Sequence, residues 1–285
     1  MATSFPPKYT QAMMAGQGLA GVTVALAGLF TTLAGPDDHT VSASSCDAYT
    51  KDWGTLVYFI IAVVVLLGCL VTYCLLQRLP VTIFYTFAVN DFDGISAFMD
   101  DVARKSDIKD GGSIGVWEVS SPSLRQFLPY GLSVFFAFMV TLSVFPGTTS
   151  LIVSARECRP GRARFFASDV FTLFSFVSFN TFDFLGRLAA GLSVVLPARW
   201  VPAASICRIV FVPLFLACRS NNSRFPYHWL WADAFPLSIM PIFAFTNGYL
   251  GSLSMMVGSR KGAWAVTAMV LFLSGGLMAG SLLSF

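Results

Sequence analysis

Charged residues are scarce in this sequence of 285 residues. They make up 12% of the chain, against roughly 25% in typical soluble domains. The formal net charge of +3 is small, and no basic cluster with interleaved aromatic residues is present, so the sequence does not indicate nucleic-acid binding. The 6 cysteines show no CxxC or zinc spacing, there are only 2 histidines, and a glycine-rich phosphate loop is absent. The sequence therefore offers no metal, cofactor or catalytic constellation that would indicate an enzyme.

Apolar residues are abundant instead. They account for 55% of the sequence, and 28 residues are Phe. Length and hydropathy predict an all-α, polytopic membrane protein with about seven transmembrane helices. The predicted spans are residues 10–34, 54–76, 127–152, 165–196, 203–219, 229–257 and 262–285. The long hydrophilic segment 77–126 is predicted to be a loop between two bundles.

Three polar residues share one face of the span 165–196. Asn180, Asp183 and Arg187 follow one another at i, i+3 and i+7, a spacing that places them on one side of a helix. Ionisable side chains at membrane depth cost about 3 kcal/mol or more, so a helix keeps them where they face a partner, a cavity or a substrate. We predict that this face lines a polar pathway.

Other charged residues lie in or near the spans. Arg208 is expected to pair with a carboxylate or with backbone carbonyls freed by a proline, either as a structural lock or as a substrate contact. Asp169 and Asp233 fall close to predicted helix starts, where a helix cap explains a carboxylate as well as a functional role does.

Small residues and prolines are predicted to shape the packing. Gly16 and Gly21 in the first span, and the GxxxG pair Gly276 and Gly280 in the last, should let helices approach closely. Helix kinks or breaks are expected at Pro146, Pro213, Pro236 and Pro241.

Several motifs resemble one known family. Asn180-x-x-Asp183-x-x-Gly186-Arg187 is similar to the signature of the equilibrative nucleoside transporters. Further stretches resemble that family in its own order: Met14–Gly21 its fifth helix, Arg208–Leu214 its ninth, and Phe243–Leu250 its tenth. The resemblance covers nearly the whole chain.

The resemblance implies a fold and a division of the chain. Members of the family have eleven transmembrane helices, arranged in bundles of six and five that resemble the major facilitator architecture. By this comparison, residues 1–76 are the last two helices of the amino-terminal bundle, 77–126 the cytoplasmic loop and 127–285 the five-helix carboxy-terminal bundle. It also leads us to expect an amino-terminally truncated member that starts near the fifth helix.

The resemblance further implies facilitative transport of nucleosides across the lipid bilayer by alternating access. Asp183, Arg187 and Asn180 are then expected to bind the substrate. The carboxylate would accept hydrogen bonds from a ribose diol or an exocyclic amine, and Arg187 would keep it ionised and oriented. No cofactor or metal is needed. Structural or gating roles are expected for Arg208, Asn247, Gly16, Gly21 and Pro213.

Alternative interpretations stay open. The chain could be a fragment that does not transport, since alternating access needs two complete bundles, or a relative that moves nucleobases or organic cations. A G-protein-coupled receptor would have a similar number of spans, but its acidic-Arg-aromatic triplet and Asn-Pro-x-x-Tyr motif are absent. The plasma membrane is favoured over an internal membrane. Asn221 begins a glycosylation sequon in a predicted outer loop, and the sequence indicates no oligomeric state.

Overall fold

The structure is a computed structural model that describes residues 7–34, 53–80, 124–156, 163–192, 196–219, 233–259 and 263–284. The helices are α1 (Pro7–Leu33), α2 (Trp53–Arg78), α4 (Leu124–Val144), α5 (Gly147–Ser150), α6 (Ser168–Leu192), α7 (Val201–Cys207), α8 (Phe211–Arg219), α9 (Ala234–Ser259) and α10 (Ala263–Leu282). Short 3-10 turns, η3 (Arg164–Phe166), η4 (Ala198–Trp200) and η5 (Arg208–Val210), precede α6, α7 and α8. The described residues contain no β-strand, and the predicted all-α class is confirmed.

Five helical segments of the described residues are long and apolar enough to cross a bilayer. They are Gln11–Leu33, Leu56–Arg78, Gln126–Ser150, Ala198–Cys218 and Ala265–Leu282. With 25 and 26 residues, α6 and α9 would each reach more than 35 Å, which exceeds a hydrocarbon core of about 30 Å. Both helices carry buried polar side chains, which are described below. The predicted polytopic membrane fold is therefore confirmed.

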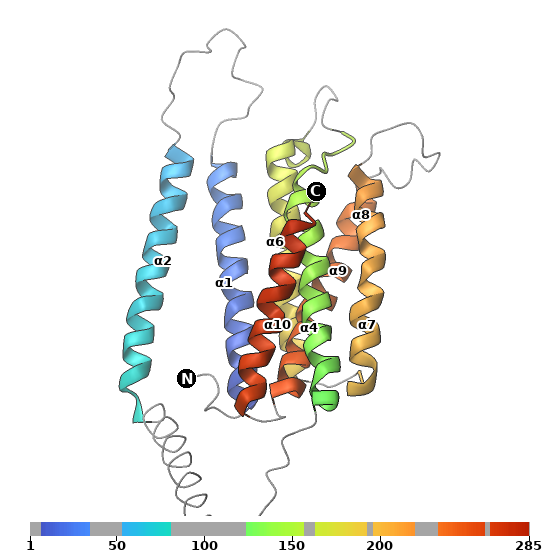
Figure 1. Cartoon of the computed structure of the whole chain (residues 1–285). Helices are drawn as coiled ribbons and strands as arrows, with labels where there is room; N and C mark the ends of the chain where they lie inside the picture. The colour runs from blue at the N-terminus through green and yellow to red at the C-terminus, as the bar shows by residue number, and fades with distance from the viewer. Residues whose placement is uncertain are drawn as a thin grey trace, which may run out of the picture.

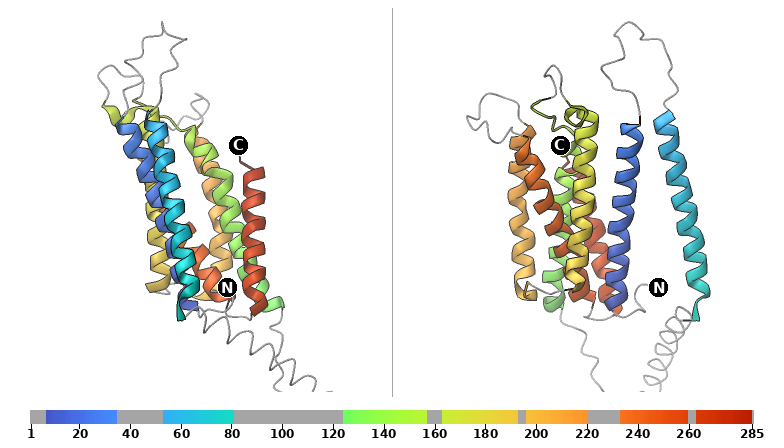
Figure 2. Two further views of the ribbon diagram at one scale, coloured as in Figure 1. Left: turned by 90° about the vertical axis from the view of Figure 1, so that its left-hand side faces the viewer. Right: turned by 180° about the vertical axis from the view of Figure 1, so that it is seen from behind.

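The long helices run side by side along one common direction (Figures 1 and 2). Helix α6 packs most extensively against α9 on one side and α1 on the other, while α4 packs against α10, α9 and α7. Helix α2 lies at the edge of the assembly beside α1 (Figure 1), and no residue of its most apolar window is buried. The centre of the bundle is thus α6 and α9, with α1 and α4 packed against them.

Phenylalanine rings form a cluster in this centre. Phe145, just after α4, stacks on Phe179 of α6 with ring centroids 3.9 Å apart. Phe179 in turn meets Phe243 of α9 at 5.9 Å, and Phe243 meets Phe215 of α8 at 5.2 Å. Phe215 and Phe243 are fully buried. Because large rings bury much apolar area and adopt preferred edge and stacked contacts, they join four helical segments into one core.

The main correction concerns the predicted span 203–219. The helical segment begins earlier, at Ala198, and is interrupted by the turn η5, which ends three residues before Pro213. Proline lacks an N–H and its ring crowds the preceding turn, which accounts for a break at this position. Of the other prolines, Pro146 separates α4 from α5 and Pro236 lies in the first turn of α9, while α9 continues through Pro241. Most of the predicted loop 77–126 lies outside the described residues, and so does Asn221.

Close packing at the GxxxG pair is confirmed. A Cβ atom added to Gly276 would overlap the carbonyl oxygen of Phe135 on α4, and one added to Gly280 would overlap that of Met139. Backbone atoms cannot move aside as flexible side chains can. The contact between α10 and α4 therefore requires glycine at both positions.

We predict that Gly276→Ala destabilises the protein by about 1–3 kcal/mol, the range for overpacking a close contact. The matched control is Gly68→Ala on α2, where no heavy atom of the described residues lies within 4 Å of the added Cβ. Thermal melting of the purified proteins in detergent measures the difference. Equal melting temperatures for the two variants would contradict the packing of α10 on α4.

Candidate functional site

A buried ion pair lies on the face of α6 that points into the bundle. The Nε atom of Arg187 donates to Oδ2 of Asp183 at 2.7 Å, across one helical turn. Asp183 is 6% exposed and Arg187 is 8% exposed. Leaving one of two such charges without its partner costs about 3–5 kcal/mol in a protein interior. Because an unpaired charge is so costly here, Asp183 and Arg187 each need the other as long as the neighbouring helices enclose them.

Two glycines bring α9 within reach of this pair. A Cβ on Gly248 would overlap the carbonyl oxygen of Asp183, and a Cβ on Gly186 would overlap that of Phe245. Small residues on both helices thus allow their backbones to touch. As a result, Asn247 reaches across, and its Nδ2 donates to Oδ1 of Asp183 at 2.7 Å. Both oxygens of the carboxylate are held, one from α6 and one from α9.

The polar contacts continue from Asn247 to α4 and η5. The hydroxyl of Thr141 lies 2.7 Å from Oδ1 of Asn247, and Nη2 of Arg208 donates to the same hydroxyl oxygen at 2.9 Å. Asn247, Thr141 and Arg208 are all at most 4% exposed. The guanidinium of Arg208 also lies 4.9 Å above the ring of Phe243. This geometry differs from the expected direct pairing of Arg208 with a carboxylate or with backbone carbonyls.

Helix α1 closes the other side of the ion pair. Nη1 of Arg187 is 3.4 Å from both the carbonyl oxygen of Met14 and Oε1 of Gln17. The side-chain amide of Gln11 donates to the carbonyl oxygen of Arg187. A Cβ on Gly18 would come within 3.0 Å of the Arg187 side chain. The α1 backbone can therefore lie directly against the guanidinium.

The structure places Asn180 beside α1 and away from the ion pair. Its Nδ2 donates to the carbonyl oxygen of Phe176 in its own helix at 2.8 Å. A Cβ on Gly21 would overlap Oδ1 of Asn180. The described contacts bring Asp183, Arg187 and Asn247 together, whereas Asn180 lies about one turn before Asp183 on α6. Its expected part in substrate binding stays a prediction.

The remaining sequence candidates lie outside the network. No heavy atom of the described residues is within 4 Å of a Cβ added to Gly16, so the described helices show no close packing there. Pro213 is the third residue of α8. Asp169 pairs with Arg164 at 2.9 Å. Asp233 accepts a hydrogen bond from the backbone N–H of Ala155 at 2.8 Å, just before α9 begins. Both carboxylates serve local structure at helix starts.

Sequence reasoning missed Thr141, Gln11 and Gln17. A single threonine in an apolar helix usually bonds to its own backbone, and Thr141 does lie 2.8 Å from the carbonyl oxygen of Ala137. Gln17 belongs to the motif Met14–Gly21 that resembled the family, but no role was assigned to it. Only the packing of α4 and α1 on α6 and α9 shows that Gln11 and Gln17 reach Arg187 and that Thr141 reaches Asn247.

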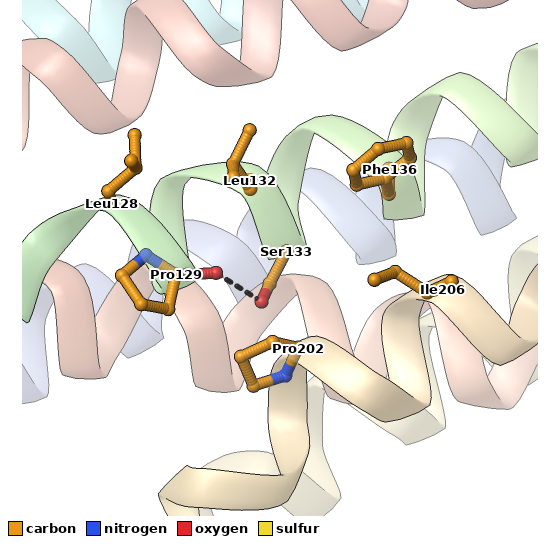
Figure 3. Close-up of a pocket in the computed structure, with 7 residues that line it drawn as sticks. All are labelled: Leu128, Pro129, Leu132, Ser133, Phe136, Pro202 and Ile206. Atoms are coloured by element: carbon orange, nitrogen blue, oxygen red, sulfur yellow. Dashed lines mark hydrogen bonds between the residues drawn. The ribbon is translucent and has the colours of Figure 1, made fainter. Parts of the chain in front are cut away.

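A separate apolar groove lies on α4 and α7. It encloses about 390 Å³ and is lined by Leu128, Pro129, Leu132, Ser133, Phe136, Pro202 and Ile206 (Figure 3). The hydroxyl of Ser133, its one polar side chain, bonds to the carbonyl oxygen of Pro129. None of the residues of the polar network lines this groove. This apolar groove has no polar side chain available for a hydrophilic ligand.

Together these features define a class of protein. A carboxylate, two guanidinium groups and an amide are enclosed near the middle of long apolar helices, at a depth where polar groups mark substrate or ion pathways. Asp183 and Asn247 both lie more than one full helical turn from either end of α6 and α9. The protein is an integral, multi-pass membrane protein with a polar site inside its helix bundle.

The comparison with known proteins identifies the family. Residues 1–285 match the family described as nucleoside transporter, and the chain belongs to this family. It is 30% identical over 307 residues to equilibrative nucleoside transporter 1 of Homo sapiens and 29% identical over 320 residues to equilibrative nucleoside transporter 2 of the same species. It is also 24% identical over 297 residues to equilibrative nucleotide transporter 1 of Arabidopsis thaliana. The family resemblance seen in the motifs is confirmed.

The chain is shorter than these relatives. The alignments cover 100%, 99% and 100% of this chain, but 63%, 65% and 58% of the respective relatives. The chain thus spans less than two thirds of the length of the curated relatives that it matches.

The energetics of the ion pair can be tested directly. Arg187→Met leaves the Asp183 carboxylate buried without its cation, and we expect a destabilisation of about 3–5 kcal/mol. Adding Asp183→Asn removes the uncompensated charge, so the double variant should regain part of this loss. Arg156→Met is the matched control, because Arg156 is 56% exposed and lies 3.7 Å from Asp233; an exposed pair contributes about 0–1 kcal/mol. Melting temperatures in detergent report all three. A double variant less stable than Arg187→Met would argue against a buried pair.

Proposed function

We propose that this protein takes part in facilitative transport of nucleosides across the membrane, with Asp183 as the central substrate contact. The observation that supports this proposal is the carboxylate itself, buried at mid-depth in a membrane bundle and held on both oxygens. The family and the relatives named above agree with it, since equilibrative nucleoside transporters are among them.

The chemistry of the site suits a neutral, hydroxyl-rich ligand. Each carboxylate oxygen can accept about two hydrogen bonds. Arg187 occupies one position on Oδ2 and Asn247 one position on Oδ1. The remaining lone pairs suit the paired hydroxyls of a ribose or an exocyclic amine of a base. A ligand that lacks these donors would leave buried acceptors unpaired, and such sites discriminate strongly against analogues of that kind.

Arg187 and Asn180 are proposed as further substrate contacts. The Nε atom of Arg187 orients the carboxylate, and its Nη1 atom points toward α1, where it could also donate to a ligand. Asn180 lies one turn along the same helix, at the contact with Gly21. The interface between α1 and α6 would then be the wall along which a nucleoside passes.

Movement is proposed to occur by rocking of two helix groups about this site. Residues 1–76 would belong to one group and 127–285 to the other, so that the contact between α1 and α6 forms part of their boundary. Gly21 and Gly18 keep this contact smooth and close. No chemical conversion, cofactor or metal enters this mechanism, and we place the protein in the plasma membrane.

Asp183→Ala should abolish nucleoside uptake because the acceptor for the ligand is lost. Uptake of radiolabelled adenosine by cells that lack their own nucleoside carriers measures this. The variant also leaves Arg187 without its partner, so the amount of protein that reaches the membrane is measured beside uptake. Asp169→Asn is the matched control, since Asp169 lies on the same helix but pairs with Arg164 at its start. We expect that control to keep its uptake. If the unaltered chain took up adenosine and Asp183→Ala took up as much, this assignment would be wrong.

A second candidate follows from the length of the chain, which covers only 63% of human equilibrative nucleoside transporter 1. Alternating access needs two complete bundles, so a protein made of these 285 residues alone would bind a nucleoside without carrying it across. Uptake of adenosine by this chain, compared with that by the human relative in the same cells, separates the two cases. Parallel assays with a nucleobase and an organic cation test the alternative substrate classes.

A further inference from the structure

Four side chains from four elements form one hydrogen-bonded row. It runs from Arg208 on η5 through Thr141 on α4 and Asn247 on α9 to Asp183 on α6, with donor–acceptor distances of 2.9, 2.7 and 2.7 Å. We propose that Arg208 and Thr141 are positioning residues that hold the Asn247 amide, and through it the Asp183 carboxylate, in one orientation. The proposal rests on the proposed function, in which Asp183 contacts the nucleoside.

The direction of this row is fixed by chemistry. A guanidinium can only donate hydrogen bonds, and an ionised carboxylate can only accept them. Asn247 must therefore turn its NH₂ group toward Asp183 and its oxygen toward Thr141. The Thr141 oxygen accepts from Arg208, so its single proton is available for the Asn247 oxygen. Every bond in the row points from the cation to the anion.

The Thr141 hydroxyl has one competing acceptor, the carbonyl oxygen of Ala137 at 2.8 Å. That oxygen already accepts a backbone bond from the same helix turn. If the proton went to Ala137, the oxygens of Thr141 and Asn247 would face each other at 2.7 Å with no proton between them. Two acceptors repel at this distance, which favours the bond to Asn247. Thr141 thus holds the amide at its oxygen end, opposite the NH₂ end that Asp183 holds.

A purely structural role explains Arg208 poorly. It is 2% exposed, yet Nε and Nη1 have no hydrogen-bond partner among the described residues. A guanidinium offers five donors, and Thr141 is its one side-chain acceptor in the described part of the chain. Replacing even a paired set of buried charges by apolar residues of similar volume is often neutral or stabilising. A cation kept here at such cost is better explained by its effect on Asp183 at the other end of the row.

Clamping both oxygens fixes the plane of the carboxylate. Arg187 holds Oδ2 from one side and Asn247 holds Oδ1 from another. The lone pairs that remain then point in set directions, which suits two hydroxyl groups at the fixed spacing of a ribose. Without Thr141 or Arg208 the amide would be held firmly at its NH₂ end alone and could tilt, and the lone pairs of Asp183 would lose their set directions. The row would therefore determine selectivity for the ribose more than it determines folding.

The test compares Thr141→Val, Arg208→Met and their combination, each made in the whole 285-residue chain. Binding of adenosine and of 2′,3′-dideoxyadenosine to the purified protein is measured by calorimetry, together with melting temperatures. Loss of one buried hydrogen bond corresponds to about a tenfold weaker adenosine affinity. We expect this loss in Thr141→Val and Arg208→Met, with little change for the dideoxy analogue, and no further loss in the double variant because both act on one row.

Two controls accompany these variants. Thr141→Ser keeps the hydroxyl and should restore adenosine affinity to within about twofold, well below the tenfold cost of a lost hydrogen bond. Thr246→Val removes a hydroxyl next to Asn247 that bonds only to carbonyl oxygens of its own helix, so its binding should be unchanged. Adenosine affinity unchanged in Thr141→Val, or losses that multiply in the double variant, would overturn the proposal. A fall in the melting temperature of Arg208→Met that accompanies its loss of affinity would also overturn the proposal, because that is the result expected if Arg208 were only a structural lock.

The outcome also separates this inference from the proposed function. If the unaltered chain binds no nucleoside, the proposed function fails by itself. The melting temperatures of the same proteins then test whether Thr141 and Arg208 are coupled. A double variant that shifts no more than the larger single variant supports the coupling of Thr141 and Arg208, and additive shifts reject it.

Discussion

The structure depends on one carboxylate that has to be satisfied inside an apolar bundle. Asp183 is buried in α6, and each of its oxygens receives a hydrogen bond from a different helix. Water cannot supply these bonds at membrane depth, so protein groups must. Gly186 and Gly248 let α6 and α9 touch, and this contact is what allows Asn247 to reach. The close packing of α6 and α9 and the hydrogen bonding of this charge therefore depend on each other.

The charges near Asp183 do not cancel. Arg187 and Arg208 bring two positive charges against one negative charge, and hydrogen bonds through Thr141 and Asn247 join Arg208 to Asp183. Such an arrangement contributes less to stability than an apolar core of the same volume would. Proteins that keep features of this kind usually use them. Here the polar row joins the carboxylate to α4 and η5, while Arg187 joins it to α1.

Much of the fold was predictable from the sequence, because long apolar runs specify membrane helices whatever their neighbours are. The boundaries of α1, α2, α6 and α10 fell within a few residues of those expected. The segment that contains Arg208 was predicted too short, since Arg199 and Pro202 hid its start. The pairing of Asp183 with Arg187 was also accessible, because helical spacing alone brings them together.

The rest of the site depends on tertiary packing and has no periodic signal. Thr141 lies 106 positions from Asn247 in sequence, and Gln17 lies 170 from Arg187. The side-chain direction of Asn180 was equally hidden: helical spacing placed it on the polar face, while contact with Gly21 sets it against α1. A stripe of polar residues thus indicated where a site lies, and the neighbouring helices decided which members of the stripe meet.

The central claim is that a nucleoside binds at Asp183 inside the bundle. An experimental structure of the protein with adenosine bound tests it most directly. The account predicts a ribose hydroxyl or a base amine within about 2.6–3.2 Å of an Asp183 oxygen, with Asn247 still bonded to the same carboxylate. Adenosine seated elsewhere, with Asp183 making only the protein contacts seen now, would contradict the account.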